Sequence, residues 1–366
     1  MQIKDNIRGD NAMDLIEIKS SLYDYTVEFV PDFLEVLKKY QDFVTYIIDR
    51  NVYELYKEKF AYINKENVFF MEATEKEKCM ETVIKIMSFW QKIGVRKNWK
   101  VICFGGGITQ DVTTIASNLF LRNIEWYFFP TTLLAMSDSC IGGKCGINFN
   151  SYKNQIGVFY PPKKIYIDVN FINTLTTDDY LNGWGEILKF SLTSDSSFFE
   201  KLKNEKSYIP CDNIEYYIHQ GLFVKKLIIE EDEFEHDLRR VLNYGHTFGH
   251  ALEAYTNNEI PHGKGVIWGL DIANYISFRK KLITKEYYLE IKKLIKEFFL
   301  KEEICIDNPD KMYEIIKTDK KVKGDNVYLA LLDGNSHLAI YPMAINGVLK
   351  EYFKNYLEET HEYYCN

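Results

Sequence analysis

The chain has 366 residues, 46% of them hydrophobic, and a formal net charge of −8. The length predicts about two domains, and the hydrophobic content is typical of a globular protein that buries a sizeable core. The acidic balance argues against general binding to nucleic acid or to an anionic membrane, although a local basic pocket could hold an anionic substrate.

The seven cysteines are scattered and include no Cys-x-x-Cys pair. This pattern favours reduced thiols, and we therefore expect a cytoplasmic protein. The polar N-terminus is not that of a signal peptide, and no apolar run reaches the length needed to span a membrane.

The first half of the chain alternates strand and helix signals. Strand patterns cover residues 25–30, 43–49, 100–104 and 124–129, and a helical pattern covers residues 111–121. Strands that alternate with helices predict a mostly parallel sheet with both faces covered.

The pattern changes near residue 175, after which helical periodicity dominates. It covers residues 178–192, 214–231, 244–255, 265–281, 285–301 and 310–318, and the few strand signals lie at 327–332 and 338–341. We therefore expect an α/β N-terminal nucleotide-binding domain over residues 1–174. A mainly α-helical C-terminal domain is expected over residues 175–366, and a cleft between two domains is a common place for a site.

A glycine triplet, Gly105-Gly106-Gly107, follows a predicted strand and opens a helix that carries Asp111. Such a turn lets backbone amides approach a phosphate, and the helix N-terminus favours an anion. The triplet differs from the Gly-x-Gly-x-x-Gly dinucleotide motif. Taken alone, it is explained equally well by a tight turn between strand and helix as by a phosphate site. Asp49-Arg-Asn51 and Thr131-Thr132 end neighbouring strands, so several strand ends meet where such folds bind nucleotides.

A second polar segment runs from Asp138 to Asn148 and is followed by Tyr152-Lys153-Asn154. We interpret it as a polar loop in which flexible glycines beside Lys144 suit an oxyanion. The alternative is a solvated loop that happens to contain a lysine.

Three histidines lie close together in sequence. His246 and His250 are four residues apart, so a helix would place both on one face. A turn-like stretch, 256–261, could return His262 to the same place, and Glu186 lies on an earlier predicted helix. Three ligands with an open position indicate a catalytic zinc site, whereas the alternative is a helix with ordinary, partly buried histidines.

These segments together resemble the 3-dehydroquinate synthase family of sugar phosphate cyclases over residues 40–340. The resemblance rests on motifs that occur in one order along the chain: Gly105-Gly-Gly with Asp111, Pro130-Thr-Thr-Leu-Leu-Ala-Met-Ser-Asp138-Ser, Gly142-Gly-Lys144, Lys153-Asn154-Gln-Ile-Gly, Gly185-Glu186-Ile-Leu-Lys189, Arg239-Arg-Val-Leu-Asn243-Tyr-Gly-His246-Thr-Phe-Gly-His250, Pro261-His262-Gly and Asp319-Lys320-Lys321.

The resemblance implies a phosphate-eliminating lyase. The expected substrate is a phosphorylated sugar acid, 3-deoxy-D-arabino-heptulosonate 7-phosphate, which is converted to 3-dehydroquinate and phosphate. NAD oxidises a ring hydroxyl transiently, phosphate leaves by β-elimination, the hydride returns, and the ring opens and closes again by an intramolecular aldol step. This reaction belongs to the shikimate pathway and to aromatic amino acid biosynthesis.

The resemblance also implies a divalent metal, Zn or Co, held by Glu186, His246 and His262. It assigns His250 to the substrate phosphate and the elimination step rather than to the metal, and we follow this assignment because it leaves room for substrate oxygens. Lys189 would reach the substrate hydroxyls that lie at the metal. Asp138 would hold a water or position the hydroxyl at the hydride-transfer centre.

Further residues match family positions for phosphate, carboxylate and NAD. Lys144, Asn154, Asn243, His250 and either Lys320 or Lys321 would surround the phosphate. Lys225 and Arg239 would pair with the substrate carboxylate. Arg122 would reach the phosphate site of a neighbouring subunit, which implies a homodimer. The NAD matches are Asp49, Asn51, Glu75, Lys78, Gly106, Gly107, Asp111, Thr131, Thr132, Lys153 and Thr174, although Glu75 and Lys78 could equally belong to a charged helix face.

The chain departs from the usual family pattern at three positions: Lys264 stands where Glu is usual, Cys145 where Thr is common, and Gln110 where Gly is usual. Lys264 adds positive charge beside the expected metal site, so the family pattern alone does not determine which sugar phosphate is the substrate.

The alternatives are a 2-deoxy-scyllo-inosose or valiolone-type synthase, a metal- and NAD-dependent polyol dehydrogenase, and a binding module that retains the fold. Arg239, Lys225 and Asn243 favour a carboxylated substrate over those of the two other synthases. Lys144, Asn154, Lys225 and Arg239 would be surplus in a dehydrogenase with a neutral substrate. The complete set of metal ligands and phosphate lysines argues against a binding module.

Overall fold

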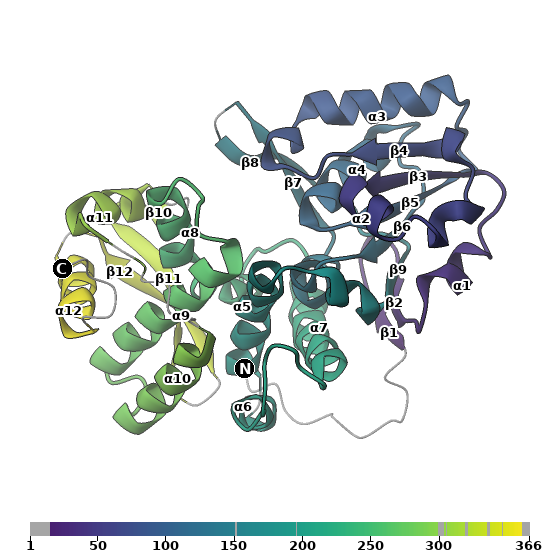
Figure 1. The fold of residues 1–366 in the computed structure, drawn as a ribbon. Helices are drawn as coiled ribbons and strands as arrows, with labels where there is room; N and C mark the ends of the chain where they lie inside the picture. Colours follow the sequence, from purple (N-terminus) through teal and green to yellow (C-terminus); the bar gives the residue numbers. More distant parts are fainter. Residues whose placement is uncertain are drawn as a thin grey trace. The chain divides into compact units, whose positions relative to one another are not determined.

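The computed structural model describes residues 15–150, 152–194, 196–298, 304, 306–318, 321–334, 337–345 and 347–360 (Figure 1). Its contacts divide the chain into two units. Of the described residues, the α/β unit comprises 15–180 and 214–234, and the helical unit comprises those between 181 and 213 and between 235 and 360. The helix Ile214–Glu231, which follows the expected domain boundary, packs in the α/β unit, where it contacts strand β1 and the turn that carries Asp138.

A seven-stranded sheet with the order β1-β2-β9-β6-β5-β3-β4 forms the core of the α/β unit. Its strands are β1 Leu15–Ile18, β2 Tyr25–Phe29, β3 Val44–Asp49, β4 Val68–Met71, β5 Lys100–Gly105, β6 Trp126–Pro130 and β9 Lys164–Ile167. All neighbours pair in parallel except β1 and β2. The central strand β6 is buried along its whole length, as expected for a parallel strand covered on both faces.

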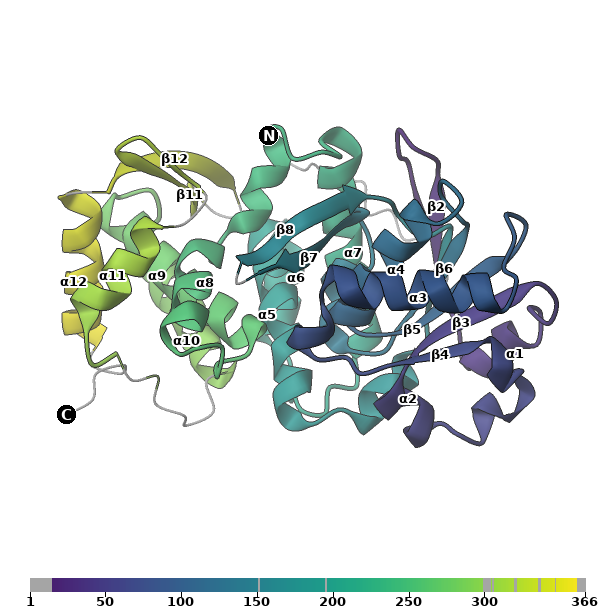
Figure 2. The same ribbon diagram turned by 90° about the horizontal axis from the view of Figure 1, so that it is seen from above.

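The helices of this unit are α1 Phe33–Leu37, α2 Arg50–Leu55, α3 Met80–Lys92, α4 Gly107–Leu119 and α7 Ile214–Glu231. A hairpin formed by β7 Lys144–Phe149 and β8 Tyr152–Phe159 lies beside α3 and α4 (Figure 2).

The structure corrects the polar loop that we expected over residues 138–148. A π-helical turn, η4 Ala135–Ser139, leads into strand β7. Cys145 and Ile147 are buried at alternate positions of that strand, while Lys144 and Phe149 at its ends are exposed, so a short alternation was hidden among polar residues and glycines.

The helical unit contains most of α5 Thr177–Thr193, together with α6 Ser196–Lys203, α8 His246–Tyr255, α9 His262–Arg279, α10 Lys285–Phe298, α11 Pro309–Lys317 and α12 Val348–Thr360. A small antiparallel sheet is formed by β10 Val322–Lys323, β11 Asn326–Leu332 and β12 Leu338–Ala344. Helix α9 contacts α8, α10, α12 and β11, and an almost continuous run of buried residues makes it the centre of this unit (Figure 1).

This architecture confirms the predicted fold class. Among the described residues, no helix has the length and the apolar character that crossing a membrane requires.

Candidate active site

Glycines allow the helices of the helical unit to approach one another closely. A Cβ atom at Gly263 of α9 would overlap the carbonyl oxygen of Asn182 on α5, and one at Gly185 would overlap the carbonyl of Gly263. The backbone amide of Gly263 also donates to the side-chain oxygen of Asn182. Helices α5 and α9 therefore meet backbone to backbone.

The same applies between α8 and α9. A Cβ at Gly249 would lie 2.7 Å from the carbonyl oxygen of Gly265, and one at Gly269 would overlap the carbonyl of Gly245. Gly245 itself adopts a φ of 77°, a left-handed conformation that suits glycine, immediately before α8 begins. These contacts bring the first residues of α8 and α9 next to the middle of α5.

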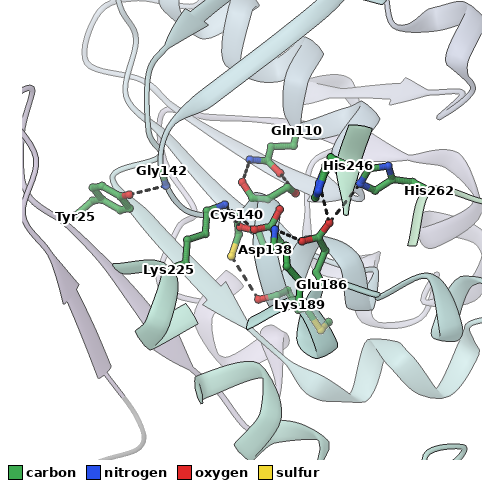
Figure 3. A network of polar contacts seen from close by, with 12 residues as sticks. Tyr25, Gln110, Asp138, Cys140, Gly142, Glu186, Lys189, Lys225, His246 and His262 are labelled. Carbon is green, nitrogen blue, oxygen red and sulfur yellow. Dashed lines mark hydrogen bonds and ion pairs between the residues drawn. The ribbon is translucent and has the colours of Figure 1, made fainter. Parts of the chain in front are cut away.

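Three residues predicted as metal ligands meet at this crossing (Figure 3). Oε1 of Glu186 lies 3.4 Å from Nε2 of His246 and 3.4 Å from Nε2 of His262. Glu186 is fully buried, and neither carboxylate oxygen has a hydrogen-bond partner of regular geometry. A buried carboxylate that faces two imidazole nitrogens fits a divalent cation, since it supplies the oxygen and nitrogen ligands that zinc accepts.

The remaining ring nitrogens of the two histidines have partners of their own. Nδ1 of His246 lies 3.0 Å from the carbonyl oxygen of Tyr244, and Nδ1 of His262 lies 2.8 Å from Oε1 of Glu253. Both partners accept hydrogen bonds, so each Nδ1 is the donor. The two Nε2 atoms are thereby directed toward Glu186.

Lys189, one helical turn after Glu186, is buried with it and forms an ion pair with its other oxygen, Oε2. Burial alone would raise the pKa of Glu186, but Lys189 and His246 outweigh it and hold the pKa well below its usual value. The carboxylate is therefore ionised and available to a cation.

The two histidines respond differently to their surroundings. Burial lowers the pKa of His246 despite the nearby Glu186. Burial would also lower the pKa of His262, but Glu186 and Glu253 together raise it to about 10. The side of the pocket around His262 thus attracts positive charge more strongly.

His250 lies in the same cluster. Its ring centroid is 5.3 Å from that of His246 and 5.6 Å from that of His262. The three histidines offer ligand atoms within 4.8 Å of one another, so the three could hold one metal ion together.

Polar residues gather at the carboxyl ends of β3, β5 and β6 in the α/β unit. Asp49 caps helix α2 by accepting a hydrogen bond from the amide of Asn51, at 2.9 Å. Gly106 precedes α4 without any side-chain cap, and a Cβ there would lie 3.0 Å from Thr132. The amide of Thr131 donates to the carbonyl of Gly105. An uncapped helix N-terminus beside glycines can hold the phosphates of a dinucleotide.

Lys78 and Asp111 form an ion pair of 2.7 Å, with both side chains largely buried. Burial raises the pKa of Asp111 although Lys78 opposes it. Glu75 accepts a hydrogen bond from the side chain of Asn148 on the β7–β8 hairpin, at 2.7 Å. The segment Glu75–Lys78 is therefore tied to α4 through Lys78 and to the hairpin through Glu75. Thr174 lies farther along the chain, in contact with Tyr56.

Asp138 lies in the π-helical turn η4, and α7 supplies its partner (Figure 3). Nζ of Lys225 is 3.0 Å from Oδ1 of Asp138 and 2.7 Å from its backbone oxygen. Gln110 of α4 and the neighbouring Ser139 exchange two hydrogen bonds of 2.7 Å each. Asp138 is thus held from α7, while its turn is held from α4.

The residues expected around phosphate and carboxylate are distributed over both units. Lys144, Lys153 and Asn154 are exposed on the hairpin, and Asn154 has a φ of 53°. Arg239 is 5% exposed in the helical unit, where the side chain of Asn243 donates to Glu235 at 2.8 Å.

Two remaining members of the predicted set are lysines near the start of the small sheet. Lys321 is partly buried just before β10, and Lys320 lies outside the described residues.

The sequence interpretation missed Glu253 and the link between Gln110 and Ser139. Glu253 lies three residues after His250 and seven after His246, so the helical spacing that grouped the histidines would have placed it on their face. Gln110 was visible only as a departure from a family pattern, and its partner is 29 residues away.

Two family models match consecutive parts of the chain. The model described as "3-dehydroquinate synthase N-terminal" covers residues 68–182, and "3-dehydroquinate synthase C-terminal" covers residues 183–322. The 3-dehydroquinate synthase of Dictyoglomus thermophilum is 34% identical over 327 residues, which span 86% of this chain and 90% of the relative.

Solved structures show the same fold. A 2-deoxy-scyllo-inosose synthase, complexed with carbaglucose-6-phosphate, NAD+ and Co2+, superposes with a TM-score of 0.82 at 22% identity, covering 93% of this chain and 99% of that one. The 2-epi-5-epi-valiolone synthase of Streptomyces hygroscopicus, with NAD+ and Zn2+ bound, gives a TM-score of 0.81 at 26% identity, covering 94% and 99%.

Proposed function

The chain belongs to the 3-dehydroquinate synthase family, and on that premise we propose that it converts 3-deoxy-D-arabino-heptulosonate 7-phosphate to 3-dehydroquinate and phosphate. One observation carries the proposal for the site itself: a buried, ionised Glu186 faces Nε2 of both His246 and His262. This donor set, in a chain with 34% identity to a curated synthase, supports a catalytic metal pocket.

Glu186, His246 and His262 would hold the divalent metal, with Zn and Co both compatible with one carboxylate and two imidazoles. When bound, the metal polarises substrate oxygens as a Lewis acid. Lys189 stays buried beside Glu186, where it can hold a substrate hydroxyl or its alkoxide next to the metal ligands.

The α/β unit would bind NAD, which accepts a hydride from the substrate and returns it. The uncapped N-terminus of α4 and Gly106–Gly107 would hold its phosphates, and Asp49 and Asn51 would contact the ribose or adenine. The remaining proposed contacts are those of Glu75, Lys78, Asp111, Thr131, Thr132, Lys153 and Thr174.

The chain's own residues have separate tasks around the substrate. Asp138, fixed by Lys225, would orient the hydroxyl that loses hydride or a water beside it. His250 would bind the substrate phosphate and take part in the proton transfer that accompanies phosphate elimination. The His250 ring lies beside both proposed metal-ligand histidines. Lys144, Asn154, Asn243 and Lys320 or Lys321 would complete the phosphate site.

Arg239 and Lys225 would recognise the substrate carboxylate. A guanidinium can bind a carboxylate through two parallel hydrogen bonds, and the burial of Arg239 would strengthen that interaction. We further propose a homodimer, in which Arg122 reaches the partner's phosphate site, and a cytoplasmic location, which fits the free thiols of the five described cysteines.

The test is phosphate release by zinc-loaded protein supplied with NAD and 3-deoxy-D-arabino-heptulosonate 7-phosphate, with the product identified by NMR. We expect 3-dehydroquinate and an equal amount of phosphate. Turnover of glucose 6-phosphate or sedoheptulose 7-phosphate, without turnover of the sugar acid, would contradict the proposed substrate and assign the enzyme to another cyclase branch.

The carboxylate role has its own variant. Arg239→Ala should weaken binding of the sugar acid by about 2 kcal/mol or more while NAD affinity is retained, since only the substrate carries the carboxylate. An equal loss of both affinities, measured by calorimetry, would remove Arg239 from that role.

A further inference from the structure

Glu253 contacts the metal pocket from behind His262. It lies on α8, and its Oε1 is 2.8 Å from Nδ1 of His262 at the start of α9. We infer that Glu253 is a positioning residue: it fixes the ring orientation and the tautomer of His262, so that Nε2 is presented to the metal. The inference rests on the proposed function, in which His262 is a ligand.

The hydrogen-bonding capacity of the two groups determines where the proton lies. An ionised carboxylate can only accept a hydrogen bond, so Nδ1 of His262 must donate. In neutral imidazole the other nitrogen then carries the lone pair, and that nitrogen faces Oε1 of Glu186, 3.4 Å away (Figure 3). A metal-bound histidine commonly has such an acceptor on its other nitrogen.

His262 depends on a side chain for this orientation, whereas His246 does not. The acceptor for Nδ1 of His246 is the backbone carbonyl of Tyr244, which no substitution removes. His262 is the first residue of α9, its side chain is 32% exposed, and Pro261 and Gly263 flank it in the chain. A ring at a helix start beside a glycine has few neighbours of its own helix to hold it.

The absence of a side chain at Gly265 lets the Glu253 side chain lie close to α9. A Cβ atom at Gly265 would lie 3.5 Å from Cγ and 3.5 Å from Oε1 of Glu253, so the carboxylate lies against the α9 backbone. The Glu253 side chain is only 13% exposed. The packing of α8 on α9 therefore positions the Glu253 carboxylate, and the hydrogen bond from that carboxylate orients His262.

The test measures metal affinity, not turnover. Glu253→Ala and Glu253→Gln are titrated with zinc in competition with a chromophoric chelator, and with Co2+ while its d–d absorption is followed. We expect Glu253→Ala to weaken zinc binding by about 10- to 100-fold and to change the Co2+ spectrum. Glu253→Gln keeps an oxygen acceptor and should recover part of the affinity.

Two controls separate this role from a general effect on the fold. Glu259→Gln removes an exposed carboxylate from the turn between α8 and α9, and it should bind zinc as the wild type does. NAD affinity and the metal-free melting temperature of the Glu253 variants should also stay close to those of the wild type.

The possible outcomes test the role of Glu253 separately from the proposed metal pocket. Failure of the wild type to bind zinc or Co2+ would overturn the proposed metal pocket. Normal zinc binding by the wild type and by Glu253→Ala would overturn the inference alone. If Glu253→Ala weakens zinc binding and lowers metal-free stability by an equal free energy, Glu253 stabilises the packing of the helices. The inferred role in orienting His262 would then be wrong.

Discussion

Lys189 places a positive charge inside the pocket that is proposed to bind a cation. It is 2% exposed and pairs with Glu186, which two histidines also face. A buried lysine in this position keeps the carboxylate ionised when no cation is bound, but it also repels any cation that arrives. We therefore expect Lys189 to weaken metal binding at the proposed site while it keeps an ammonium group beside the proposed substrate position.

We predict that Lys189→Met binds zinc more tightly than the wild type, by about fivefold or more, because a nearby like charge is removed. The same variant should lose turnover and should be less stable without metal, since Glu186 becomes a buried charge without its lysine. Chelator competition, phosphate release and metal-free melting measure the three effects.

Lys317→Met is the matched control. Lys317 pairs with Glu314 at the same three-residue spacing, but on an exposed helix surface. It should change none of the three quantities appreciably. A Lys189→Met protein with weaker zinc binding would contradict this account of the pocket.

The crossing of α5, α8 and α9 determines the pocket at the level of secondary structure. Gly263 is in contact with the α5 backbone, and Gly265 faces the α8 backbone with slightly more room. Glycine in the middle of a helix is less favourable than alanine by about 1 kcal/mol, so an alanine that fitted would stabilise the helix.

At Gly263 we predict that alanine destabilises the protein. Gly263→Ala should lower the free energy of unfolding by about 3 kcal/mol or more, because its methyl group would force α5 and α9 apart. Gly265→Ala should cost less, since its closest contact is 3.1 Å. Urea unfolding of both variants checks the order, and a Gly263→Ala protein as stable as the wild type would show that the helices can separate freely.

The sequence predicted many of these elements because helical periodicity or a short apolar run marks them. Helices α5, α7, α10 and α11 and strands β2, β3, β5 and β11 lie within one or two residues of the expected ranges, apart from the last three residues expected for α10, which lie outside the described part. Helix α9 begins at His262, three residues earlier than predicted, because Pro261 and Gly263 resemble a turn although proline favours a helix start.

Other features could not be predicted because they depend on which segments pair or cross. Strand β7 alternates over only six residues and gains its identity from pairing with β8. The histidine spacing indicated a metal pocket but left His250 and Glu186 as rival ligands, because helical periodicity does not determine which helices cross. The approach of α5 to α9 depends on glycines, whose role appears only when two backbones are compared.

Arg122 connects the single chain to the proposed homodimer. Leu121, Arg122 and Asn123 all have positive φ, between 49° and 65°, which is uncommon for residues other than glycine. Nζ of Lys97 lies among the backbone carbonyls of this turn, including that of Leu121 at 3.2 Å. A turn held so tightly presents Arg122 outward, as a residue that serves a neighbouring subunit requires.

We predict that Arg122→Ala and Lys189→Met complement each other. Each variant alone should be inactive, whereas co-expressed chains should form hybrid dimers with one complete site, built from the Arg122→Ala chain and the arginine of its partner. Random pairing gives about a quarter of wild-type turnover.

The same activity assay contains its control. Mixtures of Lys189→Met with Glu186→Gln should stay inactive, because each change disables the pocket of the chain that carries it and the partner chain cannot replace the lost residue. Turnover no higher in the Arg122→Ala mixture than in this control would mean that Arg122 acts within its own subunit or not at all.

Because α7 packs in the α/β unit, the chain passes between the two units near residues 180, 213 and 234. The units are thus interleaved, and no single cut of the polypeptide yields two intact halves: a break at the expected boundary would leave the strands without the helix that carries Lys225. We therefore expect both units to fold only from one uninterrupted chain.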